Sequence, residues 1–161
     1  MKLPILTFSF LLPILLLANT ERAGDQQLVT TSNPYNTNPW EISTLAIGQV
    51  IELKEINFGM DKYDLDEASK TSLTELRDFL VSNKSVSIEL GDHANSLPPT
   101  EYCDKLSSNR ANAVRDYLIE IGVNPDIVTA KGYGKRVPRT NDLTVNSRIA
   151  NQRVEVKILS L

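Results

Sequence analysis

One cation in this sequence stands where an apolar side chain is expected. At about 100° per residue, a predicted helix carries a stripe of apolar side chains: Leu106, Ala113, Val114, Tyr117 and Ile121. Arg110 falls in the middle of this stripe. Removing a guanidinium from water without a partner is costly. Arg110 therefore pairs with an internal carboxylate, reaches the edge of the core, or enters a cleft where it meets an anionic ligand.

Acidic and amide side chains follow the two strands expected before this helix. Asp61 lies in the loop after the first strand, where it either contacts a ligand or holds its own turn. Asp92, His93 and Asn95 lie in the loop after the second strand. A β-α-β order makes the two strands parallel, and open α/β sheets bind ligands at the carboxyl ends of strands. One cation, Arg110, facing such oxygens suits a small zwitterion or a carboxylate ligand.

A thiol and an imidazole are also present. His93 and Cys103 could be drawn as a nucleophile and its base, with Asp92 or Asp104 orienting the ring. They are instead interpreted as one surface-loop histidine and one helix cysteine, with no oxyanion-stabilising device in view. We therefore predict no enzyme. One cysteine and one histidine do not supply a structural zinc site, so no metal and no cofactor is expected.

The elements that must position these residues alternate between strands and helices. Strands are predicted over 47–58, 86–90, 128–134 and 154–159. Helices are predicted from the cap at Asp66 to 82, over about 102–121, and over 148–151, with a short helical turn at 124–126. The order β-α-β-α-β-(α)-β predicts a two-layer α/β sandwich, with a mixed four-stranded sheet and helices packed on one face.

Composition limits the classes of function. The chain has 161 residues, of which 41% are hydrophobic and 23% charged, which is the balance of one soluble domain. Its 17 Lys and Arg against 20 Asp and Glu give a formal net charge of -3. Nucleic acid is not expected as a partner, because binding it needs a dense basic patch.

The N-terminal residues predict export. Lys2 precedes an apolar run of about 15 residues, which is short for a membrane span and typical of a secretory signal peptide over 1–18. An uncleaved membrane anchor is the alternative. Residues 19–45 are polar, contain prolines and show no period, so they predict a disordered linker. The folded domain is then expected over 46–161.

Five segments, in order, resemble the OmpA-like peptidoglycan-binding domain family. They match its Phe-x-x-Asp-Lys loop (FGMDK, 58–62), its Gly-His-Thr-Asp loop (DHAN, 92–95), its Tyr-Asn-x-x-Leu-Ser-x-x-Arg-Ala helix (YCDKLSSNRA, 102–111), its glycine turn (GYG, 132–134) and its Asn-Arg-Arg-Val-Glu strand (NQRVE, 151–155). The similarity spans about 50 to 159, roughly two-thirds of the chain. It implies the same sandwich fold.

The resemblance also implies a function and a site. Family members attach the Gram-negative outer membrane, or machinery in it, to peptidoglycan, at its periplasmic face and without covalent chemistry. A loop Asp and a helix Arg grip the ammonium and the carboxylate of the diaminopimelate in the stem peptide. Arg110 matches this Arg. The implied peptide-binding residues are Arg110, Asn95, Asp61, Asp92 and Cys103.

Several positions depart from the family pattern. Asn95 replaces the loop Asp, Cys103 the Asn after Tyr, Gln152 the first Arg of the last segment, and Pro98 the glycine that bends the loop. Gly91 stands one place early, so a shifted loop would present Asp92 instead. Trading the carboxylate for an amide removes a charged hydrogen bond of about 1.5–3 kcal/mol, which weakens ammonium binding about ten- to a hundredfold.

Two functions are therefore expected as alternatives. The chain is either a peptidoglycan-binding module, weakened by Asn95, or a degenerate domain that has lost the wall ligand. In the second case it acts in protein–protein contacts with an envelope protein at the outer membrane.

Overall fold

The computed structural model describes residues 38–161. The expected signal peptide (1–18) and most of the expected linker lie outside the described residues. The last part of that linker segment is packed: Ile42–Thr44 form a 3₁₀ turn, and Trp40 and Leu45 are buried in the hydrophobic core. The Trp40 ring stacks on Phe79 with centroids 5.9 Å apart. The packed domain therefore begins before residue 46, because two apolar side chains upstream of it reach the core.

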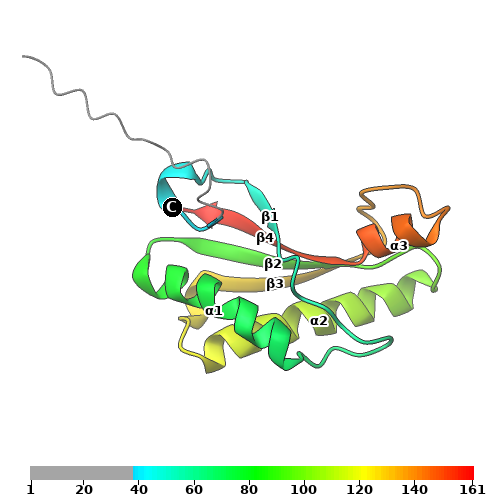
Figure 1. The fold of residues 1–161 in the computed structure, drawn as a ribbon, viewed down its shortest axis with the longest axis horizontal. Coiled ribbons are helices and arrows are strands. Elements are labelled where there is room, and N and C mark those ends of the chain that lie inside the picture. The colour runs from blue at the N-terminus through cyan, green and yellow to red at the C-terminus, as the bar shows by residue number, and fades with distance from the viewer. Residues whose placement is uncertain (1–37) are drawn as a thin grey trace, which may run out of the picture. The chain divides into compact units, whose positions relative to one another are not determined.

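Strands and helices alternate as expected (Figure 1). The strands are β1 (Val50–Glu52), β2 (Ser87–His93), β3 (Val128–Gly134) and β4 (Arg153–Ser160). The helices are α1 (Glu67–Ser82), α2 (Thr100–Glu120) and α3 (Val145–Asn151), and a 3₁₀ turn, Pro125–Ile127, precedes β3. Asp66 caps α1 as predicted, since its side chain accepts a hydrogen bond from the Ser69 N–H at 2.8 Å.

The sheet is mixed, and its strand order is β1-β4-β2-β3. β2 and β3 are parallel, whereas β4 is antiparallel to both β1 and β2. β1 and β2 therefore run in the same direction although β4 lies between them. This confirms that the segments following β1 and β2 leave from the same end of the sheet.

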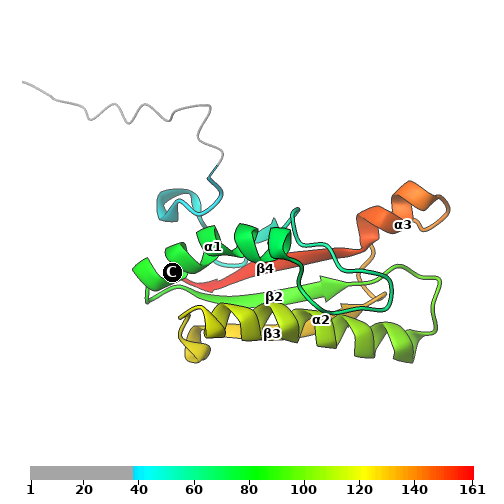
Figure 2. The same ribbon diagram turned by 60° about the horizontal axis from the view of Figure 1, so that its bottom comes forward.

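Helices α1 and α2 pack on one face of the sheet (Figures 1 and 2). The core combines inward-facing strand residues such as Ile88 and Val156 with Leu76 of α1 and Leu118 of α2, all at most 1% exposed. The two-layer α/β sandwich is thus confirmed. None of the helices in this part of the chain is long and apolar enough to cross a membrane.

The buried face of α2 differs from the predicted stripe. It consists of Cys103, Ser107, Arg110, Ala111, Val114 and Leu118. Of the predicted stripe, Val114 is fully buried, but Leu106 and Tyr117 are only half-buried. The reason is a close approach of α2 to β3, where a Cβ added to Gly132 would lie 2.3 Å from the Ser108 nitrogen. Small residues must face β3 there, which turns the larger ones to the side.

Candidate ligand-binding site

A cavity of about 520 Å³, the Arg110 pocket, opens at the end of the sheet where β1 and β2 finish. Its walls come from the segment between β1 and α1, the loop between β2 and α2, and the first turns of α2. Four of the five predicted site residues line it: Asp61, Asn95, Cys103 and Arg110. Residues from three distant parts of the sequence therefore meet here, as the parallel strands required.

Arg110 is held by backbone carbonyls. Its side chain is buried (7% exposed), with Nε donating to the Lys62 oxygen at 2.8 Å and Nη2 to the Gly59 oxygen at 2.9 Å. The guanidinium carbon lies 4.9 Å from the centroid of the Phe58 ring. Within residues 38–161, Arg110 forms no salt bridge. It therefore has neither the internal ion pair nor the exposed position that the sequence left open. Carbonyl partners leave its positive charge uncancelled beside the cavity.

Asp61 lies on the opposing loop in a left-handed conformation (φ 57°). Its Oδ1 accepts a hydrogen bond from the Tyr102 hydroxyl, which raises the pKa of Tyr102. This bond joins the loop to the first turn of α2. The second carboxylate oxygen, Oδ2, has no hydrogen-bond partner in the described residues. Asp61 thus stabilises its loop and still offers an acceptor.

Asn95 offers the opposite chemistry from an acid. Its Oδ1 accepts a hydrogen bond from the Leu97 N–H at 3.1 Å, a bond that only the carboxamide oxygen can make. The NH₂ group makes no hydrogen bond in the described part of the chain. Position 95 therefore presents a neutral donor beside the guanidinium. The loop is held further by Lys135, which donates to the Pro98 oxygen at 2.8 Å.

Asp92 was expected in the loop, but β2 continues through it to His93. Pairing with β3 and β4 extends the strand, and alternation turns Asp92 to the helix face with Leu90. Its carboxyl is 2% exposed, and Oδ2 has no hydrogen-bond partner. Burial raises the pKa of Asp92 to about 8, although the Arg110 and Arg153 charges act to lower it.

Asp92 nevertheless lies next to the Arg110 pocket. Together with Arg110, Arg153 and Gln152 it lines a neighbouring cavity of about 90 Å³. Phe58, Arg110 and Gln152 line both cavities. A carboxyl group therefore stands behind the guanidinium, outside the main pocket.

The imidazole and the thiol do not form a catalytic pair. His93 is buried rather than on a surface loop; its ring stacks on Tyr133 at 4.8 Å, and Nε2 lies 3.1 Å from Glu155 Oε2. Cys103 is buried, and its thiol donates to the backbone carbonyl oxygen of Asn95 at 3.6 Å. Burial raises the pKa of Cys103 and lowers the pKa of His93. Neither group is poised for nucleophilic attack.

Within residues 38–161, no group of three or more His, Cys, Asp or Glu side chains is arranged to hold a metal ion.

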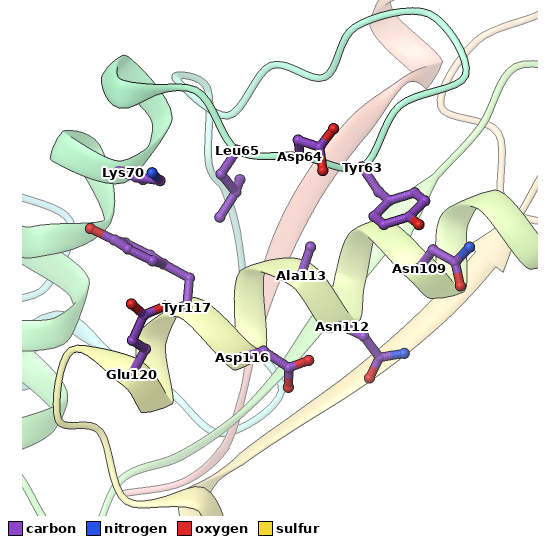
Figure 3. Close-up of a pocket in the computed structure, with 10 residues that line it drawn as sticks. All are labelled: Tyr63, Asp64, Leu65, Lys70, Asn109, Asn112, Ala113, Asp116, Tyr117 and Glu120. Carbon is purple, nitrogen blue, oxygen red and sulfur yellow. The ribbon is translucent and has the colours of Figure 1, made fainter.

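A second cavity, the helix groove, contains none of the predicted residues (Figure 3). It measures about 510 Å³ and lies between the segment before α1, helix α1 and helix α2. Its lining includes Tyr63, Asp64, Asn109, Asn112, Asp116 and Tyr117. The polar residues Asn109, Asn112 and Asp116 are spaced to share one face of α2, and this spacing could have predicted the α2 side of the groove. No pattern in the sequence marks the segment around Tyr63, which completes the groove.

Comparison with known proteins places these features in one family. The sequence model of the OmpA family matches residues 57–152. The chain is 36% identical over 115 residues to outer membrane porin F of Pseudomonas aeruginosa, which covers 70% of this chain and 33% of the relative. The chain is also 32% identical to outer membrane porin F of Pseudomonas fluorescens, in a match that covers 70% of this chain and 35% of that relative. The chain thus spans about a third of these relatives.

Solved structures share the fold at lower identity. The periplasmic domain of Helicobacter pylori MotB superposes with a TM-score of 0.62 at 20% identity, covering 72% of this chain and 78% of that one. The peptidoglycan-associated lipoprotein of Burkholderia pseudomallei superposes with a TM-score of 0.60 at 24% identity, covering 64% of this chain and 87% of that one. Both show the architecture described above.

Proposed function

Because the chain belongs to the OmpA family, we propose that its domain binds peptidoglycan non-covalently in the bacterial envelope, through the Arg110 pocket. The observation that carries the proposal is the Arg110 guanidinium, which borders a cavity of about 520 Å³ and has no carboxylate partner in the described residues. One protein of similar structure is named a peptidoglycan-associated lipoprotein. The two relatives of similar sequence are named outer membrane porins. An exported, periplasmic location is proposed on the same ground.

The pocket suits one end of a diaminopimelate-type stem peptide. A carboxylate meets the free N–H groups of Arg110. The ammonium lies between Asp61, which is the acidic side chain among the pocket residues, and the uncharged Asn95. Met60, Leu97 and Leu106 supply apolar walls for the methylene chain between the two charges. Asn95 makes the grip weaker than a carboxylate at this position would.

Co-sedimentation with purified peptidoglycan sacculi tests the proposal. The full chain is expected to sediment with sacculi at low salt, and Arg110→Ala is expected to remain in the supernatant. Arg115→Ala is the matched control, because Arg115 lies on the same helix and also donates to a backbone carbonyl, that of Val128 at 3.0 Å. Arg110→Lys, which keeps the charge, distinguishes loss of binding from loss of folding. Absence of the folded wild-type chain from the pellet at low salt contradicts the proposal.

A second candidate is a protein–protein contact. Large apolar side chains at this end of the molecule are strongly exposed: Met60 (89%), Leu97 (69%) and Leu143 (81%). Met60 and Leu97 line the pocket, and Asp142, beside Leu143, accepts a hydrogen bond from the Ser96 N–H. An envelope protein that binds the chain, and loses binding with Met60→Ser and Leu97→Ser, would favour this candidate when sacculi are not bound.

A further inference from the structure

The helix groove carries a set of polar groups that the domain itself does not use. Figure 3 shows the side chains of Asn109, Asn112 and Asp116 in a row along α2, with the Tyr63 ring facing them from the segment before α1. The Asn112 NH₂ group donates to the backbone carbonyl oxygen of Ser108 at 2.8 Å, which leaves the Asn112 Oδ1 as an acceptor. In the described residues, the Asn109 carboxamide and the Tyr63 hydroxyl have no hydrogen-bond partner. These groups donate and accept without bringing positive charge.

The charges in the groove disfavour an anion. Lys70, its cation, pairs with Glu67 at 2.7 Å and lies 6.0 Å from the Tyr117 ring centroid. Asp116 pairs with Arg115 at 3.2 Å. Asp64 has no ion pair within residues 38–161. A groove with this balance repels carboxylates and phosphates, and accepts a neutral ligand rich in hydroxyl and amide groups.

Two tyrosine rings add apolar surface to this polar row. Tyr63 is about half exposed, and Tyr117 is half-buried at the opposite end, beside Lys70. A ring face packs well against a saturated six-membered ring, while carboxamides and carboxylates hydrogen-bond to its hydroxyls. At about 510 Å³ the groove is in the size range of ligand pockets.

The groove adjoins the Arg110 pocket. Asn109 and Arg110 are consecutive residues of α2, yet Asn109 lines the groove and Arg110 lines the pocket. The segment between β1 and α1 contributes to both, with Met60 and Asp61 in the pocket and Tyr63 in the groove. A polymer with an anionic peptide branch and neutral sugar rings can occupy the two cavities together.

We propose that the helix groove binds a neutral N-acetylhexosamine of the glycan strand, while the Arg110 pocket holds the peptide. This inference rests on the proposed function. It adds a sugar subsite formed by Tyr63, Asn109 and Asn112, with Asp64 as an acceptor that an amide can replace.

The test uses the full chain and two probes: a β-1,4-linked N-acetylglucosamine tetramer without peptide, and a soluble diaminopimelate-containing stem peptide. Titrations are followed by amide chemical shifts in NMR. The tetramer is expected to shift residues 63–65 and 109–116, with Kd of about 1 mM. Tyr63→Ala is expected to weaken it roughly tenfold, whereas Tyr63→Phe keeps the ring and most of the affinity.

Two further variants separate the outcomes. Asn95→Asp, a change in the loop between β2 and α2, is expected to leave tetramer affinity unchanged and to strengthen binding of the stem peptide. Asp64→Asn is expected to keep the tetramer. Stem-peptide binding without any tetramer response overturns the sugar subsite and leaves the proposed function standing. Failure of both probes and of sacculi overturns both proposals. Binding of a lysine tripeptide in the groove, abolished by Asp64→Asn, identifies a cation site and also overturns the inference.

Discussion

The Nε atom of Arg110 lies 2.8 Å from the carbonyl oxygen of Lys62, and this hydrogen bond ties helix α2 to the segment that follows β1. A second bond, from Nη2 to the Gly59 oxygen, spans the same loop at 2.9 Å. One side chain therefore shapes the pocket wall and supplies the pocket's positive charge. Such a wall is ordered before a ligand arrives, which lowers the entropy cost of binding.

Arg110→Ala is expected to loosen this loop more than the rest of the domain. Two carbonyls lose their donor, and each lost hydrogen bond costs about 1 kcal/mol. Amide hydrogen exchange in residues 59–63 should therefore accelerate roughly tenfold or more, while exchange in α1 stays the same. Arg115→Ala serves as the comparison, and unchanged exchange in residues 59–63 of Arg110→Ala would contradict this role.

Asp92→Asn is expected to make stability less sensitive to pH. The folded-state pKa of Asp92 is raised from 3.8 to about 8. Between these values the unfolded chain releases a proton that the folded chain retains, so wild-type stability falls as pH rises from about 4 to 8. Asp92→Asn lacks this dependence on pH. Its free energy of unfolding should therefore exceed that of wild type by an amount that grows with pH, to the order of 2–4 kcal/mol at pH 8.

Urea unfolding of wild type and Asp92→Asn at pH 4, 6 and 8 measures this difference. Glu101→Gln, a change at an exposed residue of α2, is the control and should shift stability little at any of the three values. A difference between wild type and Asp92→Asn that stays constant from pH 4 to 8 would mean that Asp92 ionises normally.

Cys103 is expected to resist thiol reagents in the folded protein. The side chain is 1% exposed, and burial raises its pKa, so the thiolate that reacts is scarce and shielded. Modification by a disulfide reagent should follow the kinetics of opening and become complete in denaturant. Rapid stoichiometric reaction under native conditions, at the rate of a free thiol, would show that the thiol is accessible.

Gly132→Ala is expected to destabilise the packing of α2 on β3. The added Cβ would lie 2.3 Å from the Ser108 nitrogen and 2.6 Å from the Ser107 Oγ, so the helix must move. Overpacking of this kind costs about 1–3 kcal/mol. Gly59→Ala is the matched control, since its nearest neighbour is the Lys62 Cδ at 3.2 Å, in a flexible side chain. Equal urea midpoints for the two variants would contradict the close approach.

The fold follows from local patterns in the sequence. Alternation in β2 and β4 and the Asp66 cap each predict an element that the structure contains. Residues 132–134, expected as a glycine turn, instead belong to β3 and pair with β2. These signals are local, and a right-handed β-α-β connection leaves few ways to assemble them. That assembly also brought Asp61, Asn95 and Arg110 to one cavity.

The details of the site depend on tertiary contacts that no local pattern encodes. The run Gly91-Asp92-His93 has the composition of a loop, but pairing with β3 and β4 keeps it in the sheet and buries Asp92. The partners of Arg110 are backbone carbonyls, which every residue has, so side-chain types do not reveal them. The buried face of α2 was shifted because small residues permit contact with Gly132.

Asn95→Asp is expected to strengthen binding of a diaminopimelate-containing peptide. The wild-type carboxamide presents only its NH₂ group, whereas a carboxylate accepts a charged hydrogen bond from an ammonium. The gain should be about ten- to a hundredfold in Kd, by calorimetry at low salt. An N-acetylated peptide, which lacks the ammonium, should not gain. An equal gain for both peptides, or no gain for either, would be inconsistent with this orientation of the ligand.

NMR titration of the wild-type chain with the stem peptide, observing the Arg110 side-chain N–H signals, addresses the pocket most directly. We predict that the Nη signals and the amides of residues 59–61 and 95–97 shift together and saturate, because the peptide carboxylate meets the guanidinium there. If the peptide or sacculi bind while the Arg110 signals remain in place, the guanidinium is not the recognition element and the proposed site is wrong.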